Sequence, residues 1–315
     1  MDFNEIFLHL NLFHQSKKQG VSVWQYPQFL FLIMGIMTIV AILTSYGIGI
    51  RYVAEPEIVV LVVLVLSALL MLVTFTITQS FERLIEANRM KSEFVSIVSH
   101  QIRSPLSNLR WSLELLMSGR LGPIEAAQLE YFRILKESSN RMRDLTKDLL
   151  TVSRIDQGRL PLNPKAFSIP DLVKGLVSEF IPLATASNVK IEVVVDNNLP
   201  SVFADQQKVG LVVENFLDNS IRYIEEKGKV KMKITKEKNC IRFEISDNGV
   251  GIPKDDQKYM FRRFFRSSNV LKRQTQGTGL GLYIAKSIIE RSKGKIGFQS
   301  KENQGSTFWF TLPIA

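Results

Sequence analysis

The stretch Asp247–Leu282, DNGVGIPKDDQKYMFRRFFRSSNVLKRQTQGTGLGL, decides the fold of the C-terminal half of the chain. It starts at the end of Cys240–Asp247, where apolar and polar residues alternate as in a β-strand. Its last residues enter a predicted helix, Leu280–Arg291. The loop ahead of this helix consists of Gly277, Thr278, Gly279, Leu280 and Gly281. Free amides and the positive end of the helix dipole meet at such a loop, which favours a phosphate group.

A second pair of glycines stands at the start of the same stretch. Gly249 and Gly251 follow the strand directly, and glycine lets the backbone approach a ligand closely. A dinucleotide-binding Rossmann site would need its glycines after an early strand, with an acidic residue ~20 positions later. Here the glycines come late and follow a long polar loop, and no Gly-Lys-Ser/Thr occurs. The Rossmann, P-loop and protein-kinase sites are therefore excluded.

The surrounding residues, 161–315, alternate strands and helices and predict one compact α/β domain. The other expected strands are Lys190–Val195, Lys229–Thr235, Lys295–Ser300 and Thr307–Leu312, and the other expected helices are Asp171–Ala186 and Gln206–Ile224. In the second of these helices Asn215 and Asn219 share one face at a spacing of four residues. Arg222 and Tyr223 follow at its end.

Upstream, residues 79–160 predict two amphipathic helices joined by a turn. Apolar residues recur at steps of three and four at Val95, Val98, Ile102, Leu106, Leu109, Leu113 and Leu116, and again at Leu135, Met142, Leu145, Leu149 and Val152. Leu121–Pro123 separates the helices, and Gly158 and Pro161 end the second. Such a hairpin buries its apolar stripes by pairing with a second copy into a four-helix bundle. Packing of a single hairpin on another domain is the alternative.

His100 is the one histidine between the hydrophobic segments and the C-terminus, because the other two are His9 and His14. It lies off the apolar stripe and should face solvent. Pro105 lacks an amide hydrogen and loosens the helix one turn later, and Ser104 lies on the face of His100. An exposed imidazole with a free ring nitrogen is a plausible nucleophile, although most surface histidines are bystanders.

Two uncharged segments, Phe29–Ile50 and Ile58–Thr78, are each long enough to cross a bilayer as a helix. Buried soluble helices or a cleaved signal peptide fit these segments less well. Only Arg51–Glu57 lies between them, too short for a sensor domain. Basic residues flank the pair at Lys17, Lys18, Arg83, Arg89 and Lys91, which predicts both termini in the cytoplasm. The N-terminal segment, 1–28, is either a short amphipathic helix on the inner leaflet or a frayed tail.

The composition adds two limits. The net charge of +10 is explained by a cytoplasmic and juxtamembrane excess of lysine and arginine. No basic run alternates with aromatic residues, so nucleic-acid binding is not expected. The single cysteine, Cys240, has no partner for an internal disulfide, as is usual in a reducing compartment.

From Glu93 to the C-terminus the chain resembles the two-component sensor histidine kinases. Five motifs occur in the family's order: a phosphoacceptor box at His100–Pro105, an N box at Asn215–Tyr223, a first glycine box at Asp247–Gly251, an F box at Phe261–Phe265 and a second glycine box at Gly277–Gly281. Gly305–Phe308 matches the family's last strand. Any one motif is weak, but the ordered set is specific.

The resemblance implies the fold and the ligands. The fold would be two transmembrane helices, a helical hairpin that dimerises as a four-helix bundle, and an α/β sandwich ATP-binding domain of the GHKL or Bergerat type. ATP and Mg²⁺ would be bound, with Asn219 on the metal and Asn215 in support. Asp247 would accept a hydrogen bond from the adenine amino group and Tyr223 would flank the base.

The remaining motif residues also receive roles from the resemblance. Arg222 and the second glycine box would approach the phosphates. Residues 252–276 would form a mobile lid held by three phenylalanines, Phe261, Phe264 and Phe265. The ATP domain would rotate on a linker at Gly158–Lys165 to reach His100.

Gln101 and Ser104 depart from the family pattern. The family has a carboxylate beside the histidine that orients the ring and takes its proton. A glutamine amide can orient the ring but cannot act as a base, and general-base assistance is commonly worth ~10²–10⁴-fold. Ser104 replaces the usual Thr or Asn that positions water for a phosphatase reaction, which leaves that reaction open.

The sequence thus predicts a dimeric, multi-pass kinase of a bacterial cytoplasmic membrane. It would phosphorylate its own His100 and pass the phosphoryl group to an aspartate on the receiver domain of a response regulator. The short exterior loop allows three sources of the signal: membrane stress, another membrane protein or a transported compound. The rival classes are a GHKL-type ATPase, which would have Glu at the position of Asn215, and a catalytically weak signalling scaffold.

Overall fold

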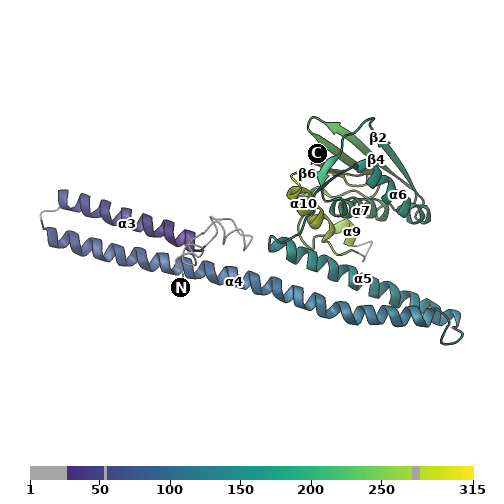
Figure 1. Cartoon of the computed structure of the whole chain (residues 1–315), viewed down its shortest axis with the longest axis horizontal. Helices are drawn as coiled ribbons and strands as arrows, with labels where there is room; N and C mark the ends of the chain where they lie inside the picture. The colour runs from purple at the N-terminus through teal and green to yellow at the C-terminus, as the bar shows by residue number, and fades with distance from the viewer. Residues whose placement is uncertain (1–26, 53–54, 272–276) are drawn as a thin grey trace. The chain divides into compact units, whose positions relative to one another are not determined.

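The computed structural model describes residues 27–52, 55–271 and 277–315 (Figure 1). They form two compact units. One runs to His100 and includes Asp156–Arg159, and the other comprises Gln101–Ile155 and Leu160–Ala315. The predicted amphipathic stretch near the N-terminus and the flanking Lys17 and Lys18 lie outside the described residues.

The first unit is built on two long helices, α3 (Pro27–Tyr52) and the first part of α4 (Pro56–Met117). Both are long and apolar enough to cross a membrane. Their apolar side chains point outward, as Leu43 and Leu61 illustrate with exposed fractions of 64% and 63%. The helices coincide with the two uncharged segments expected from the sequence. Helix α4 continues without a break past the second of these segments and through Pro105.

The second unit begins with a helical hairpin made of the end of α4 and of α5 (Ala126–Asp156). The turn between them contains Gly119 and Gly122 with φ of +73° and +125°, a backbone conformation that favours glycine. Within the chain only two members of the α4 stripe are buried, Leu106 and Leu113. The predicted hairpin and the break before Pro123 are confirmed.

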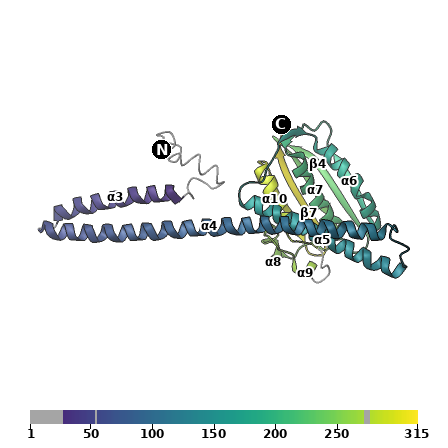
Figure 2. The same ribbon diagram turned by 60° about the horizontal axis from the view of Figure 1, so that its bottom comes forward.

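The rest of the second unit is built on a five-stranded sheet with a helical layer on one face (Figures 1 and 2). The sheet has the order β2-β4-β5-β7-β6, with β2 and β4 parallel and the other neighbours antiparallel. Its strands are β2 (Val189–Val195), β4 (Gly228–Glu237), β5 (Cys240–Asp247), β6 (Lys295–Lys301) and β7 (Gly305–Pro313). A small sheet pairs β1 (Lys165–Phe167) with β3 (Val202–Ala204).

Three helices cover the sheet, namely α6 (Ile169–Ala186), α7 (Gln206–Arg222) and α10 (Gly281–Arg291). Local sequence fixes where two of them start. Ser168 caps α6 by accepting from the Asp171 amide, and Asp205 caps α7 by accepting from the Lys208 amide. Two short helices, α8 (Lys254–Gln257) and α9 (Ser268–Leu271), lie between β5 and α10.

The core lies between the sheet and the helices. In β4, buried apolar residues such as Met232 alternate with exposed lysines, which turns one face of the strand to the helices. The rings of Phe216, Phe243 and Phe310 are fully buried there. Every strand and helix expected in this domain is present with ends shifted by a few residues. The sequence did not indicate β1, β3, α8 or α9, because elements of three or four residues show no periodicity.

Candidate functional site

Helix α7 and the second glycine box meet directly. A Cβ atom added to Gly281 would collide with the side-chain oxygen of Asn215, so the first turn of α10 can lie against α7 only because residue 281 is glycine. Asn215 is held by a hydrogen bond from its amide nitrogen to the Leu211 carbonyl, at 3.2 Å. Asn219 lies one turn further along α7 and is half-buried. The N box and the second glycine box are therefore parts of one site.

Gly279 joins the same loop to the F box. Its φ is +68°, and an added Cβ would lie 2.8 Å from the backbone carbon of Phe264 and 2.9 Å from the carbonyl oxygen of Phe265. Glycine is needed here both for the backbone conformation and for the close approach of a second backbone segment. The sequence had suggested only the approach of a phosphate at this position.

Asp247 ends strand β5 and is tied to two neighbouring segments. One oxygen of its carboxyl group accepts from the amides of Gly249 at 2.9 Å and Ser306 at 3.2 Å, and the other accepts from the Ser220 hydroxyl at 3.4 Å. Burial raises the pKa of Asp247 to about 6, although these hydrogen bonds act in the opposite direction. The side chain can thus accept from a polar ligand or share a proton near neutral pH.

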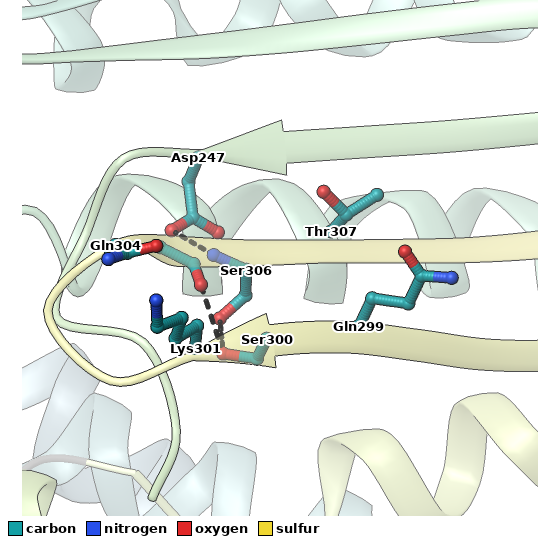
Figure 3. Close-up of a pocket in the computed structure, with 8 residues that line it drawn as sticks. Asp247, Gln299, Ser300, Lys301, Gln304, Ser306 and Thr307 are labelled. Carbon is teal, nitrogen blue, oxygen red and sulfur yellow. Dashed lines mark hydrogen bonds between the residues drawn. The ribbon is translucent and has the colours of Figure 1, made fainter.

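A cavity of about 300 Å³ adjoins Asp247 at the end of strands β6 and β7 (Figure 3). Its lining includes Ser300, Lys301 and Ser306, and the Ser300 hydroxyl bonds that of Ser306 at 2.8 Å. The figure shows the Asp247 carboxyl directed at the amide of Ser306, across the turn that carries Gln304. The Ser306 amide, at the start of β7, thus holds the carboxyl from the side of that strand.

The residues at the end of α7 border the first glycine box. Tyr223 is the C-cap of α7, and its carbonyl accepts from the Val250 amide at 3.0 Å. Burial raises the pKa of the Tyr223 hydroxyl, so it stays protonated. Arg222 forms a two-pronged ion pair with Asp218 one turn earlier, at 2.9 Å. Its expected approach to phosphates stays a prediction.

The segment between the two glycine boxes is described as far as Leu271. Phe261 packs edge-on against Phe298, with ring centroids 5.7 Å apart, and Phe265 packs on Tyr259. Phe264, by contrast, is 60% exposed and has φ of +59°, so it does not hold the segment by burial. Phe261 thus contacts β6 and Phe265 packs within the segment itself, and the role of the three phenylalanines in holding a lid stays a prediction.

Polar contacts that the sequence did not indicate also hold this segment. One oxygen of Asp256 accepts from the Ser267 hydroxyl and from the amide and hydroxyl of Ser268, at 2.8 to 2.9 Å. The Asn269 side chain donates to the Gly251 carbonyl at 3.0 Å, which ties α9 to the first glycine box. No motif marks these residues, because the partners are 11 to 18 positions apart.

His100, Gln101 and Ser104 all lie on helix α4 with exposed side chains. Ser99, the residue before the histidine, is buried. The position of His100 off the apolar stripe is as expected. Because Pro105 has no amide hydrogen, the Gln101 carbonyl has no helical donor at this turn.

Mg²⁺ is bound in proteins mainly by oxygen atoms. Among residues 27–52, 55–271 and 277–315, no group of three His, Cys, Asp or Glu side chains could hold a metal ion alone. Magnesium is commonly bound through one or two protein oxygens together with substrate phosphates and water. The half-buried amide of Asn219, one turn of α7 beyond Asn215, fits that arrangement, so Asn219 would hold the ion together with a nucleotide.

Comparison with protein families gives two matches, one over the helical hairpin and one over the α/β domain. Residues 90–158 match the family described as "His Kinase A (phospho-acceptor) domain". Residues 204–315 match "Histidine kinase-, DNA gyrase B-, and HSP90-like ATPase".

Curated relatives and solved structures agree with these matches. The sensor histidine kinase GacS of Pseudomonas protegens is 32% identical over 73% of this chain, and the circadian input-output histidine kinase CikA of Synechococcus elongatus is 31% identical over 72%. The chain spans only 25% and 30% of the length of those two relatives. The crystal structure of full-length ShkA in complex with AMPPNP is similar with a TM-score of 0.61 and 27% identity, covering 71% of this chain and 46% of that one.

Proposed function

Because the chain belongs to the two-component sensor histidine kinases, we propose that it uses ATP to phosphorylate its own His100 and then passes the phosphoryl group to an aspartate of a response regulator. The observation that carries the proposal is the packing of the second glycine box on both Asn215 and the F box. Asn215 and Gly281, which are 66 positions apart in the sequence, share one surface, as a nucleotide site requires.

Different residues of that surface contact different parts of the nucleotide. Asp247 accepts a hydrogen bond from the amino group of adenine, which selects adenine over bases that lack this donor. The amides of Gly279 and its neighbours face the phosphates, helped by the positive end of α10. Asn219 would hold Mg²⁺, whose chemistry is to neutralise the charge of the transferred group.

His100 is the phosphoryl acceptor. One ring nitrogen attacks the γ-phosphorus, an N–P bond forms, and the bond to the bridging oxygen breaks so that ADP leaves. The ring loses a proton in this step. The Gln101 amide accepts a hydrogen bond that fixes the ring, and because it is no base, the proton passes to solvent.

Dimerisation through the hairpin is part of the proposal. Four residues of the two predicted stripes are 40 to 48% exposed in the single chain: Ile102, Leu109, Leu135 and Met142. A second copy would bury them in a four-helix bundle. Helices α3 and α4 would anchor this dimer in the bacterial cytoplasmic membrane with both termini inside, where another membrane protein would supply the signal.

Labelled ATP tests the proposal. The full chain in lipid nanodiscs, given Mg²⁺ and ATP labelled at the γ-phosphate, should become labelled in a form that survives alkali and decays in acid. His100→Ala should lose the label and keep nucleotide binding, whereas His14→Ala, the matched control, should keep both. Label persisting in His100→Ala would refute the acceptor. Release of free phosphate without labelled protein would favour the ATPase class instead.

A further inference from the structure

Thr278, in the middle of the second glycine box, is bonded to a residue that the proposed function does not use. Its hydroxyl donates to the carboxyl group of Asp148 at 2.9 Å. Asp148 lies in α5, 130 positions earlier in the chain and near the end of the hairpin. The contact therefore joins the glycine-rich loop directly to the helical hairpin.

The last turns of α5 are fixed against the α/β domain close to this contact. Val152 and Ile155 are buried in the same apolar core as the helices of that domain. The Ile155 carbonyl accepts from the Arg291 guanidinium at 2.9 Å. Arg291 ends α10 and Thr278 precedes its start, so one hydrogen bond to α5 lies near each end of α10. Asp148 is accordingly held in place by its own helix.

The hydrogen bonds of the loop leave Thr278 no donor for a phosphate. The hydroxyl has one proton, which is given to Asp148, and its oxygen accepts from the Leu280 amide at 3.2 Å. The Leu280 amide is one of those that the start of α10 offers to an anion. A phosphate at this loop would need both donors and would also be repelled by the carboxylate.

Burial raises the pKa of Asp148, and the hydrogen bond from Thr278 partly offsets that effect. The carboxyl group is half-buried. The Asp148 carboxylate is partly removed from water, and the hydrogen bond from Thr278 stabilises it there. If the Thr278 hydroxyl donated to a phosphate instead, Asp148 would lose this bond, and its movement toward solvent would be favoured.

We propose that Asp148 is an acidic latch that competes with the phosphates of a nucleoside triphosphate for Thr278. Nucleotide binding breaks the latch and frees the end of α5 from the glycine-rich loop. By linkage, any force on α5 that strengthens the latch weakens nucleotide binding by the same factor. This inference rests on the proposed nucleotide site and adds a route by which the hairpin regulates it.

Nucleotide affinity of the full chain in nanodiscs tests the latch. Dissociation constants for AMPPNP and for adenosine are measured by displacement of a fluorescent ATP analogue, for the wild type, Asp148→Asn and Asp148→Ala. Asp148→Asn keeps the shape and one acceptor but removes the charge. The matched control is Asp144→Asn, one turn earlier on α5, whose exposed carboxyl bonds Arg143 at 3.3 Å.

We expect both Asp148 variants to bind AMPPNP at least about fivefold more tightly, the lower end of usual coupling between sites. Adenosine, which has no phosphates, should bind the wild type and both variants equally, and Asp144→Asn should match the wild type. Tighter AMPPNP binding by Asp148→Ala alone would show that the hydrogen bond to Thr278, and not the negative charge of Asp148, opposes the phosphates.

Two results would overturn the latch: unchanged AMPPNP affinity in both variants, or an equal gain for adenosine. Either would leave the nucleotide site standing. A wild type that binds no adenine nucleotide would instead overturn the proposed function, and the latch with it.

Discussion

The helical hairpin and the α/β domain bury their apolar residues in different ways. In the domain, Phe216, Phe243 and Phe310 have no exposed surface. In the hairpin, Ile102 and Leu135 remain 40% and 48% exposed. Burial of apolar surface stabilises by about 25 cal/mol per Å². The domain therefore supplies its own stability, whereas the exposed apolar residues of the hairpin would be buried only in the proposed dimer.

The same contrast separates the two groups proposed to react with or bind the nucleotide. His100 stands exposed on a helix, as an acceptor that must meet a moving phosphate needs to be. Asp247 is half-buried and accepts hydrogen bonds from three donors, as a group that fixes the position of a base needs to do. Substitutions should accordingly have structural consequences in the domain and partner-dependent or kinetic consequences in the hairpin.

The largest effect on activity is expected where the second glycine box packs against α7 and the F box. Gly279→Ala places a methyl group 2.8 Å from the Phe264 backbone at a φ of +68°, so the glycine-rich loop must shift. We expect autophosphorylation to fall more than about 100-fold, because misplacement of ~1 Å has costs of that order. Labelled-ATP assays would measure this.

Gly175→Ala is the matched control for that substitution. Gly175 is exposed in the middle of α6, and nothing lies within 4 Å of an added Cβ. Alanine there should stabilise the helix by about 0.5–1 kcal/mol and leave activity unchanged. Equal activity of the two variants would show that the glycine-rich loop tolerates movement. The α/β domain would then not be rigid at this site.

A pair of truncations tests the difference in packing. In the fragment Phe81–Ala315, which we expect to be a soluble dimer, Phe310→Ala should lower the free energy of unfolding by about 3–5 kcal/mol. Leu109→Ala should instead weaken the dimer at least about tenfold, since Leu109 is 40% exposed in the single chain. Urea denaturation and sedimentation separate the two effects. A monomeric fragment well above micromolar concentration would count against the bundle.

The buried carboxyl predicts a pH-dependent effect of intermediate size. The pKa of Asp247 is about 6 in the folded protein and about 4 when unfolded, so its protonated form is favoured by folding. Its contribution to stability is complete below pH ~4 and is lost as the pH rises through 6, by at most about 3 kcal/mol. Asp247→Asn should therefore be more stable than the wild type at pH 7 and no more stable at pH 4.

The same variant should bind ATP more weakly at pH 7, because one acceptor of the adenine amino group is replaced by an amide. Thermal or urea unfolding at pH 4, 5.5 and 7 gives the stability difference, and nucleotide titration gives the affinity. A variant that is more stable at pH 7 but binds ATP as well as the wild type would remove Asp247 from the base site.

The smallest effect is expected on the exposed helix. Gln101→Glu supplies a base beside His100, and we expect autophosphorylation to accelerate a few-fold. Rapid-quench measurements on pre-bound ATP between pH 6 and 8 would detect it. Equal rates at every pH would mean that a conformational step limits the reaction. Ser104→Ala in the same assays, followed through dephosphorylation of the response regulator, would test whether that hydroxyl positions water.

The sequence by itself determined most of the architecture. The stripe containing Leu106 predicted the hairpin, the alternation around Phe243 predicted a strand, and the uncharged segments predicted α3 and the start of α4. It also indicated that His100 would be exposed. These properties depend on residues within one or two turns of each other, so periodicity and the placement of glycine and proline express them directly.

Only the tertiary structure decided which motifs touch. The contact of Gly279 with Phe264, the bonds of Asp247 to Ser220 and Ser306, and the latch between Asp148 and Thr278 join residues 15 to 130 positions apart. Such pairs form where the order of strands in the sheet and the packing of helices on it bring distant segments together. Polar partners of this kind follow no period, because each bond is set by the position of a side chain after the core has formed.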